Sequence, residues 1–155
     1  MKPLTHVMGM ATKLLMEQTT PQGGEDIRFL EHLDLAELTK GSYTGRKGSS
    51  DEYEAGTSTI IGKLSDSVIL YRMHSAYTGS HNGFQFGKLN GSGWALKGAA
   101  TAQEIYSIDT KLDDGLANSG SIITQNGNGE SGCITSEAYV RTSTSETCRM
   151  WFDWQ

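Results

Sequence analysis

The sequence predicts an α+β domain in which helices pack on a small antiparallel sheet. Before about residue 40, apolar residues recur at intervals of three and four, which is the spacing of one helical face. From residue 57 the pattern changes to short β-type runs bounded by Gly, Ser or Asn. The chain has 155 residues, of which 36% are hydrophobic and 20% charged. This length and composition predict one folded domain over residues 1–155.

Two helices are predicted before the sheet. The first covers residues 4–18, an amphipathic segment whose apolar face would consist of Leu4, Val7, Met8, Ala11, Leu14 and Leu15. Residues 19–24 interrupt it with Pro and Gly. Glu25 and Asp26 then begin the second helix, because acidic residues are favoured at the positive end of the helix dipole. Gly41 is expected to end this second helix, and an exposed loop is expected over residues 45–56.

Five strands are predicted, at residues 59–64, 68–73, 84–89, 121–124 and 148–154. In the last of these runs, one set of side chains alternates with another: Cys148, Met150, Phe152 and Trp154 with Arg149, Trp151 and Asp153. Such alternation places the two sets on opposite faces of a sheet, and the first set is expected to be buried. Trp151 then either packs beneath a loop or belongs to a partner surface, and packing is favoured.

One more helix is predicted between the strands. Thr101 and Glu104 have the spacing of a capping box, in which the hydroxyl and the carboxylate each accept a hydrogen bond from the other residue's main-chain N–H. Gly115 is expected to end the helix. The face of this helix that packs on the core is expected to carry Ile105, Ile108 and Leu112.

Three aspartates cluster near the end of this helix, and two roles are open to them. Asp113 and Asp114 lie at the negative end of the helix dipole, where each carboxylate is disfavoured by roughly 0.3–1 kcal/mol, so compensating contacts are expected. With Asp109, they could bind calcium through hard oxygen ligands, although the spacing is not that of an EF-hand. The favoured interpretation is turn capping, with Asp109 paired to Lys111 or another cation. No other cofactor is expected.

The two cysteines, Cys133 and Cys148, could form a disulfide, remain buried thiols or provide half of a metal site. The chain has no other cysteine, and none of its four histidines has a ligand-like spacing to either one. The disulfide is therefore favoured, and it indicates an oxidising compartment.

Catalysis and nucleic-acid binding are not indicated. The net charge of −5 argues against a protein that binds the phosphate backbone, which requires clustered Lys and Arg. The glycines of residues 127–132 fit a dinucleotide-binding spacing, but they are followed by Cys133 and a Thr- and Ser-rich run instead of the helix that such a site needs. His32 lies within a helical apolar pattern, where a structural role is favoured. We therefore expect a protein that is not an enzyme.

Two segments resemble type IV pilins and the pseudopilins of type II secretion. The first is Ile-Asp-Thr-Lys-Leu-Asp-Asp-Gly at residues 108–115, followed by Gly120 and a cysteine pair around an aromatic strand. The second is Phe-Leu-Glu-His-Leu at residues 29–33, followed by Leu-Ala at 35–36 and Gly-Ser-Tyr at 41–43. Together they span most of residues 25–155.

The resemblance implies a headpiece in which an N-terminal helix, here the remaining half-helix at residues 4–18, packs on a small sheet closed by a C-terminal disulfide loop. It implies a filament subunit, major or minor pilin or pseudopilin, whose partners are other subunits and the assembly platform of the inner membrane. The location implied is periplasmic or extracellular, in a cell-surface filament, with a precursor anchored in the inner membrane. The family's leader peptide and the apolar first half of its N-terminal helix are not found in residues 1–155. We therefore expect these residues to form the soluble headpiece of such a subunit. The alternative is a tip or adhesin-like module on the same scaffold that binds a glycan, a host surface or DNA.

Overall fold

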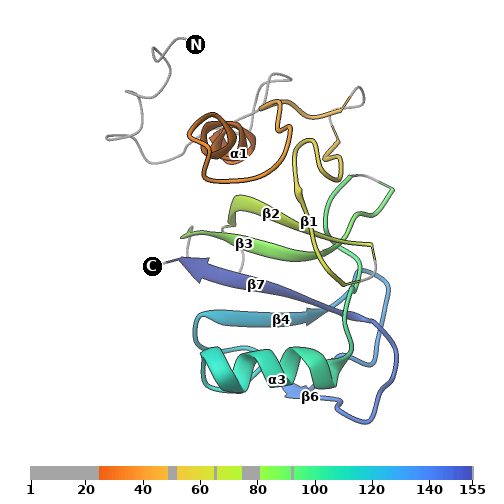
Figure 1. Cartoon of the computed structure of the whole chain (residues 1–155). Helices are drawn as coiled ribbons and strands as arrows, with labels where there is room; N and C mark the ends of the chain where they lie inside the picture. Colours follow the sequence, from red (N-terminus) through yellow and green to blue (C-terminus); the bar gives the residue numbers. More distant parts are fainter. Residues whose placement is uncertain (1–24, 49–51, 65, 75–80, 92, 155) are drawn as a thin grey trace.

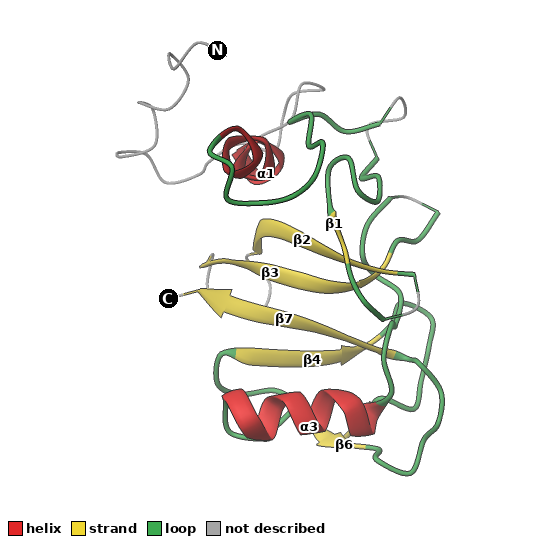
Figure 2. Cartoon of the chain, in the orientation of Figure 1, coloured by secondary structure: helices red, strands yellow, loops and turns green. Residues whose placement is uncertain are grey.

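The computed structural model describes residues 25–48, 52–64, 66–74, 81–91 and 93–154, and they form an α+β fold (Figure 2). The predicted helix at residues 4–18 lies outside the described residues. The elements, in chain order, are α1 (Glu25–Leu35), β1 (Ile60–Ile61), β2 (Ser67–His74), β3 (His81–Lys88), α3 (Ala102–Leu112), β4 (Ile122–Asn126), β5 (Ile134–Thr135), β6 (Ala138–Tyr139) and β7 (Cys148–Trp154). Within these ranges, no helix has the length and apolar character needed to cross a bilayer.

The main sheet has five antiparallel strands in the order β1-β2-β3-β7-β4, and β5 and β6 form a separate hairpin. The antiparallel sheet was predicted and is confirmed, whereas the short hairpin was not predicted. The helix α1 packs against β2, whereas α3 packs against β7 and β6, and Figure 1 shows the two helices on opposite sides of the sheet. The C-terminal strand β7 lies inside the sheet, where it pairs with both β3 and β4.

Each face of the sheet carries its own hydrophobic cluster. The cluster on the α3 side includes Ile105, Ile122 and Met150, with Ile69 packed against it. Val68 and Leu70, the residues on either side of Ile69 in β2, point to the other face of the sheet. They belong to a second cluster that also contains Ile27, Tyr53 and Ala95. Both faces are therefore covered, which explains why neighbouring residues of β2 are apolar rather than alternating with polar ones.

The helix α1 ends six residues before Gly41, so the prediction of its end was wrong. Its last turn closes in a Schellman motif: the N–H of Glu37 donates to the carbonyl of Asp34 at 3.0 Å, and that of Leu38 to the carbonyl of Leu33 at 2.9 Å. Glu37 takes the left-handed conformation that Gly more often supplies, with φ of 59°. Because the residue is not Gly, the sequence did not reveal this stop.

The helix α3 begins as predicted and buries a different stripe. The capping box between Thr101 and Glu104 is present in both directions. Ile105 is fully buried, but Leu112 is 70% exposed, so its predicted inward position was wrong. Asp109 is fully buried in its place, one turn earlier. A polar side chain therefore occupies the inner face of the last turn.

The predicted disulfide between Cys133 and Cys148 is confirmed, and both residues are fully buried in the α3-side cluster. It joins the first residue of β7 to the loop that leads into β5. Trp151 is only 5% exposed, in agreement with the prediction that it packs within the molecule. The loop over residues 45–56 was expected to be exposed, yet Tyr53 is 3% exposed, so that expectation was wrong at this residue.

Candidate functional site

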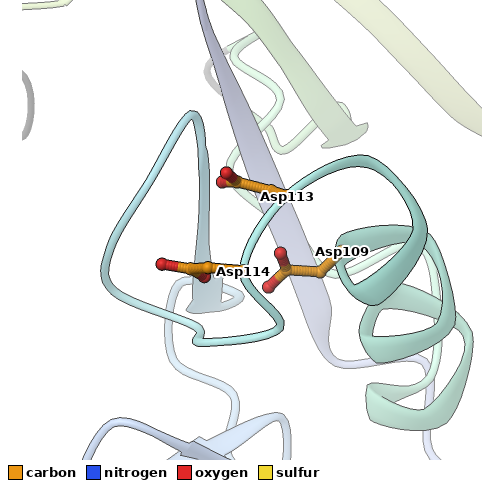
Figure 3. Close-up of side chains that lie close together, drawn as sticks. All are labelled: Asp109, Asp113 and Asp114. Carbon is orange, nitrogen blue, oxygen red and sulfur yellow. The ribbon is translucent and has the colours of Figure 1, made fainter.

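The candidate site is the corner where α3 ends and the chain turns toward β4. Asp109 comes from the last turn of α3, and Asp113 and Asp114 come directly after the helix. One carboxylate oxygen from each residue lies within 4.8 Å of the others. Figure 3 shows the three side chains around the turn. The structure thus brings together the three residues that the sequence singled out.

The carboxylate of Asp113 joins the end of α3 to the start of β4. Its Oδ2 accepts hydrogen bonds from the main-chain N–H groups of Ser121 at 2.6 Å and Ile122 at 2.8 Å. These donors lie outside the helix, so their positive dipoles offset the unfavourable helix dipole at this end. The carboxylate also lies so close to Gly120 that a Cβ there would collide with it. Gly120, which has a positive φ of 75°, is therefore needed for this contact.

The carboxylate of Asp114 folds the turn itself. Its Oδ1 accepts a hydrogen bond from the N–H of Leu116 at 2.8 Å, and its Oδ2 accepts one from the hydroxyl of Ser119 at 2.6 Å. The first of these bonds, to the residue two positions on, is the pattern of an Asx turn. The Ser119 hydroxyl, with the Leu116 amide, lowers the pKa of Asp114. The side chain is consequently ionised over the whole physiological range of pH.

The carboxylate of Asp109 is the buried member of the group. Its Oδ1 accepts a hydrogen bond from the N–H of Gly115 at 3.1 Å, and its Oδ2 accepts one from the phenol of Tyr139 at 2.6 Å. These partners stand where a cation such as Lys111 was expected. Burial raises the pKa of Asp109 above its ordinary value, although the Tyr139 and Gly115 hydrogen bonds act in the opposite direction. Asp109 therefore holds the start of the turn against the β5–β6 hairpin.

Tyr139 is the member of the site that the sequence did not reveal. It lies in β6, 30 residues after Asp109, within a Ser- and Thr-rich segment without a strong strand pattern. Its hydroxyl also shares a 2.8 Å hydrogen bond with the hydroxyl of Thr124 in β4. Burial and the Asp109 carboxylate raise the pKa of the phenol, which remains protonated at neutral pH. Tyr139 thus links α3, β4 and β6 through one oxygen atom.

Chemically, this site is suited to holding main-chain groups in place. Each carboxylate already accepts hydrogen bonds from amide or hydroxyl donors. Calcium prefers six to eight oxygen ligands, and the three aspartates supply part of such a set. Calcium binding at Asp109, Asp113 and Asp114 stays a prediction.

Comparison with known proteins identifies no relative. No protein-family model, no curated protein and no solved structure matches the chain. The functional interpretation therefore depends on the geometry of the site and on the sequence pattern at residues 108–115.

Proposed function

We propose that the protein is a structural subunit of a type IV pilus or of a type II secretion-type filament, either a major or minor pilin or a pseudopilin. The described residues would form its headpiece. Its partners would be other subunits of the filament and the assembly platform of the inner membrane. The location would be the periplasm or the cell surface. In this proposal no residue is catalytic.

The observation that carries the proposal is the structural role of the segment at residues 108–115. This segment carries the sequence resemblance to the pilin group, and its three aspartates bind main-chain amides and hydroxyls at a corner of the fold. A subunit that must present a fixed surface to its neighbours needs such a rigid corner. An enzyme would instead need an acid, base or nucleophile directed at a substrate.

The order of the elements also supports the proposal. Among the described residues, the helix α1 precedes the sheet and packs on it through Ile27 and Leu30, which are 0% and 1% exposed. Its Phe29 stacks on Tyr71 with the ring centroids 4.3 Å apart. The C-terminal strand is then tied by the disulfide to the loop before β5. The resemblance implies this succession of helix, sheet and disulfide loop, although fold alone does not determine function.

The test is whether the protein enters filaments in the cell that carries its gene. Antibodies raised against the purified chain would be used on filaments sheared from those cells, with immunogold electron microscopy and sedimentation. We expect label along the filaments, or at one end for a tip subunit. A matched strain without the prepilin peptidase should keep the antigen in the membrane fraction. Antigen that stays in a non-sedimenting form in both strains would contradict the proposal.

A recognition module on the same scaffold is the second candidate. The observation that favours it is a cavity between α3 and the β5–β6 hairpin.

A further inference from the structure

A cavity of about 460 Å³ opens between the second half of α3, the turn after it and the β5–β6 hairpin. This volume falls in the range of about 300–1,000 Å³ that is common for small-molecule sites. Two aromatic rings, those of Tyr106 and Tyr139, line it together with polar side chains from Asn118 and Arg141. The cavity lies beside the aspartate corner and uses different side chains from it, apart from Tyr139. None of the structural roles described above requires Tyr106, Asn118 or Arg141.

The guanidinium of Arg141 lies over an aromatic ring and has no ionic partner among the described residues. Its guanidinium carbon lies 4.6 Å from the centre of the Tyr106 ring. At this distance the cation is attracted to the face of the ring, and the guanidinium group carries five N–H donors in a planar fork. Within the part of the chain that the structure describes, Arg141 forms no ion pair with a carboxylate. The fork is therefore free to take a planar anion in a bidentate geometry.

The two tyrosines form an aromatic wall. Their rings pack edge to face, with centroids 5.6 Å apart and an angle of 65° between the planes. The hydroxyl of Tyr139 is already engaged by Asp109 and Thr124, so this residue offers its ring to the cavity. An aromatic wall beside a cation suits a ligand that has both an apolar face and an anionic group.

The hairpin turn at the cavity rim holds two non-glycine residues in a strained backbone conformation. Ser136 and Glu137 are the two residues between β5 and β6, and both have positive φ, 46° and 73°. A two-residue turn of this type is adopted most readily by Asn-Gly. The described residues contain only two other non-glycine residues with positive φ. Both Ser136 and Glu137 line the cavity, and strain of this kind is concentrated at functional sites.

We propose that this cavity binds an acidic sugar, that is, a pyranose ring that bears a carboxylate. The C–H face of the ring would lie on the aromatic wall, and the carboxylate would bind the guanidinium of Arg141. Ring hydroxyls would donate to the carboxylate of Glu137 and exchange hydrogen bonds with Asn118 and Ser136. Polyanions such as nucleic acids fit poorly, because Glu137 would repel a second phosphate and, among the described residues, Arg141 is the only cation that lines the cavity. This inference does not depend on filament assembly.

The first experiment measures binding to the purified chain by calorimetry and NMR shifts. The probes are oligosaccharides that contain galacturonate, glucuronate or sialic acid, and the same oligosaccharides after reduction of their carboxylates to alcohols. We expect at least one acidic probe to bind about tenfold or more tightly than its reduced form, because a charge-assisted bidentate contact is lost. Shifts should centre on residues 106, 118 and 136–141. Failure of all acidic probes, or equal binding of the reduced forms, would overturn the proposal. A short peptide with a free terminal carboxylate serves as a comparison probe, and tighter binding of this peptide than of any acidic sugar would also overturn the proposal.

Two variants then separate the cavity from the fold. Arg141→Lys keeps the charge and removes the planar fork, so we expect about tenfold weaker binding of the acidic probe. The matched control is Arg46→Lys, which changes another exposed arginine in the loop after α1, and which should bind like the original chain. Unchanged binding by Arg141→Lys would overturn the carboxylate contact.

The turn variant combines Ser136→Asn with Glu137→Gly. These residues suit the turn better, so we expect a higher Tm together with weaker binding of the acidic probe. A turn that is purely structural would give the higher Tm with binding unchanged, and this result would remove the two side chains from the site. Because the variant is expected to be more stable than the original, a loss of binding cannot be ascribed to unfolding.

Discussion

The half of the molecule around α3 and the half around α1 are held together by different kinds of contact. Around α3, carboxylates bind main-chain amides of the turn and of β4, and a disulfide closes the C-terminal loop. Around α1, rings and cations stack, as Arg141 and Tyr106 also do at the rim of the cavity in the α3 half. Phe29 packs on Tyr71, and the guanidinium carbon of Arg72 lies 4.5 Å from the centre of the Trp94 ring.

The two kinds of contact constrain the chain to different degrees. A hydrogen bond to a main-chain amide has a narrow range of distance and angle, so it fixes the path of the chain. Stacked rings accept a broader range of geometries and stabilise chiefly by burying apolar area. We therefore expect the α3 half to lose stability sharply when a single polar atom is removed, and the α1 half to respond more weakly.

The largest effect is expected from removing the disulfide. Replacing both Cys133 and Cys148 with Ala should lower the free energy of unfolding by about 3 kcal/mol, the value of the chain-entropy model for a loop of this length. Urea unfolding of the variant and the original chain measures the loss. Hydrogen exchange should show that amides of α3 and β4 lose more protection than those of β2. Equal loss across both halves would contradict the comparison.

The next largest effect is expected at Asp109. Asp109→Ala leaves the part-buried N–H of Gly115 without its acceptor and the phenol of Tyr139 with only one partner. We expect a loss of about 2 kcal/mol, because an unsatisfied buried polar group is costly. The matched control is Asp109→Asn, whose amide oxygen can still accept from Gly115 and whose NH2 group can donate to Tyr139. If the two variants were equally destabilised in urea, these hydrogen bonds would not be the cause.

The same contrast explains what the sequence could and could not predict. The capping box of Thr101 and Glu104, the cysteine pair and the aspartate cluster depend on short spacings or on the only candidates of their type. The contact between Phe29 and Tyr71 joins residues 42 positions apart (71 − 29), and no local pattern indicates it. Leu112 was misplaced because its spacing fits the apolar stripe, whereas the buried position is taken by Asp109, whose partner Tyr139 comes from a hairpin with weak sequence signals.

A smaller effect is expected on the α1 side. The phenol of Tyr53 donates a 2.5 Å hydrogen bond to Oδ2 of Asp26 in α1. Tyr53→Phe keeps the ring in the second cluster and removes this bond, which should cost about 1 kcal/mol. Thermal and urea unfolding provide the measurement. A loss as large as that of Asp109→Ala would show that the α1 half also depends on single polar atoms.

A pH titration should isolate the buried charge of Asp109. Its pKa is raised in the folded state, so the folded protein holds the proton in a pH window where the unfolded chain has released it. The stabilising contribution is thus complete below about pH 4, the ordinary pKa of Asp, and is lost as pH rises through the folded pKa. The free energy of unfolding of the original chain relative to Asp109→Asn should therefore fall as pH rises through this window. A relative stability that is constant or rises with pH would exclude burial as the dominant influence.

The smallest effect is expected from calcium. The oxygens of Asp109, Asp113 and Asp114 that face the turn already accept hydrogen bonds from amides and hydroxyls, and a bound ion would have to compete with these donors for the same oxygens. We therefore expect the same Tm in excess calcium as in a chelator. A Tm that rises with calcium and returns with chelator would show that the corner is a cation site, and the loss of that rise in Asp113→Asn would place the ion there. In that case the α3 half would owe part of its rigidity to a metal, and the contrast with the α1 half would be larger than hydrogen bonds alone provide.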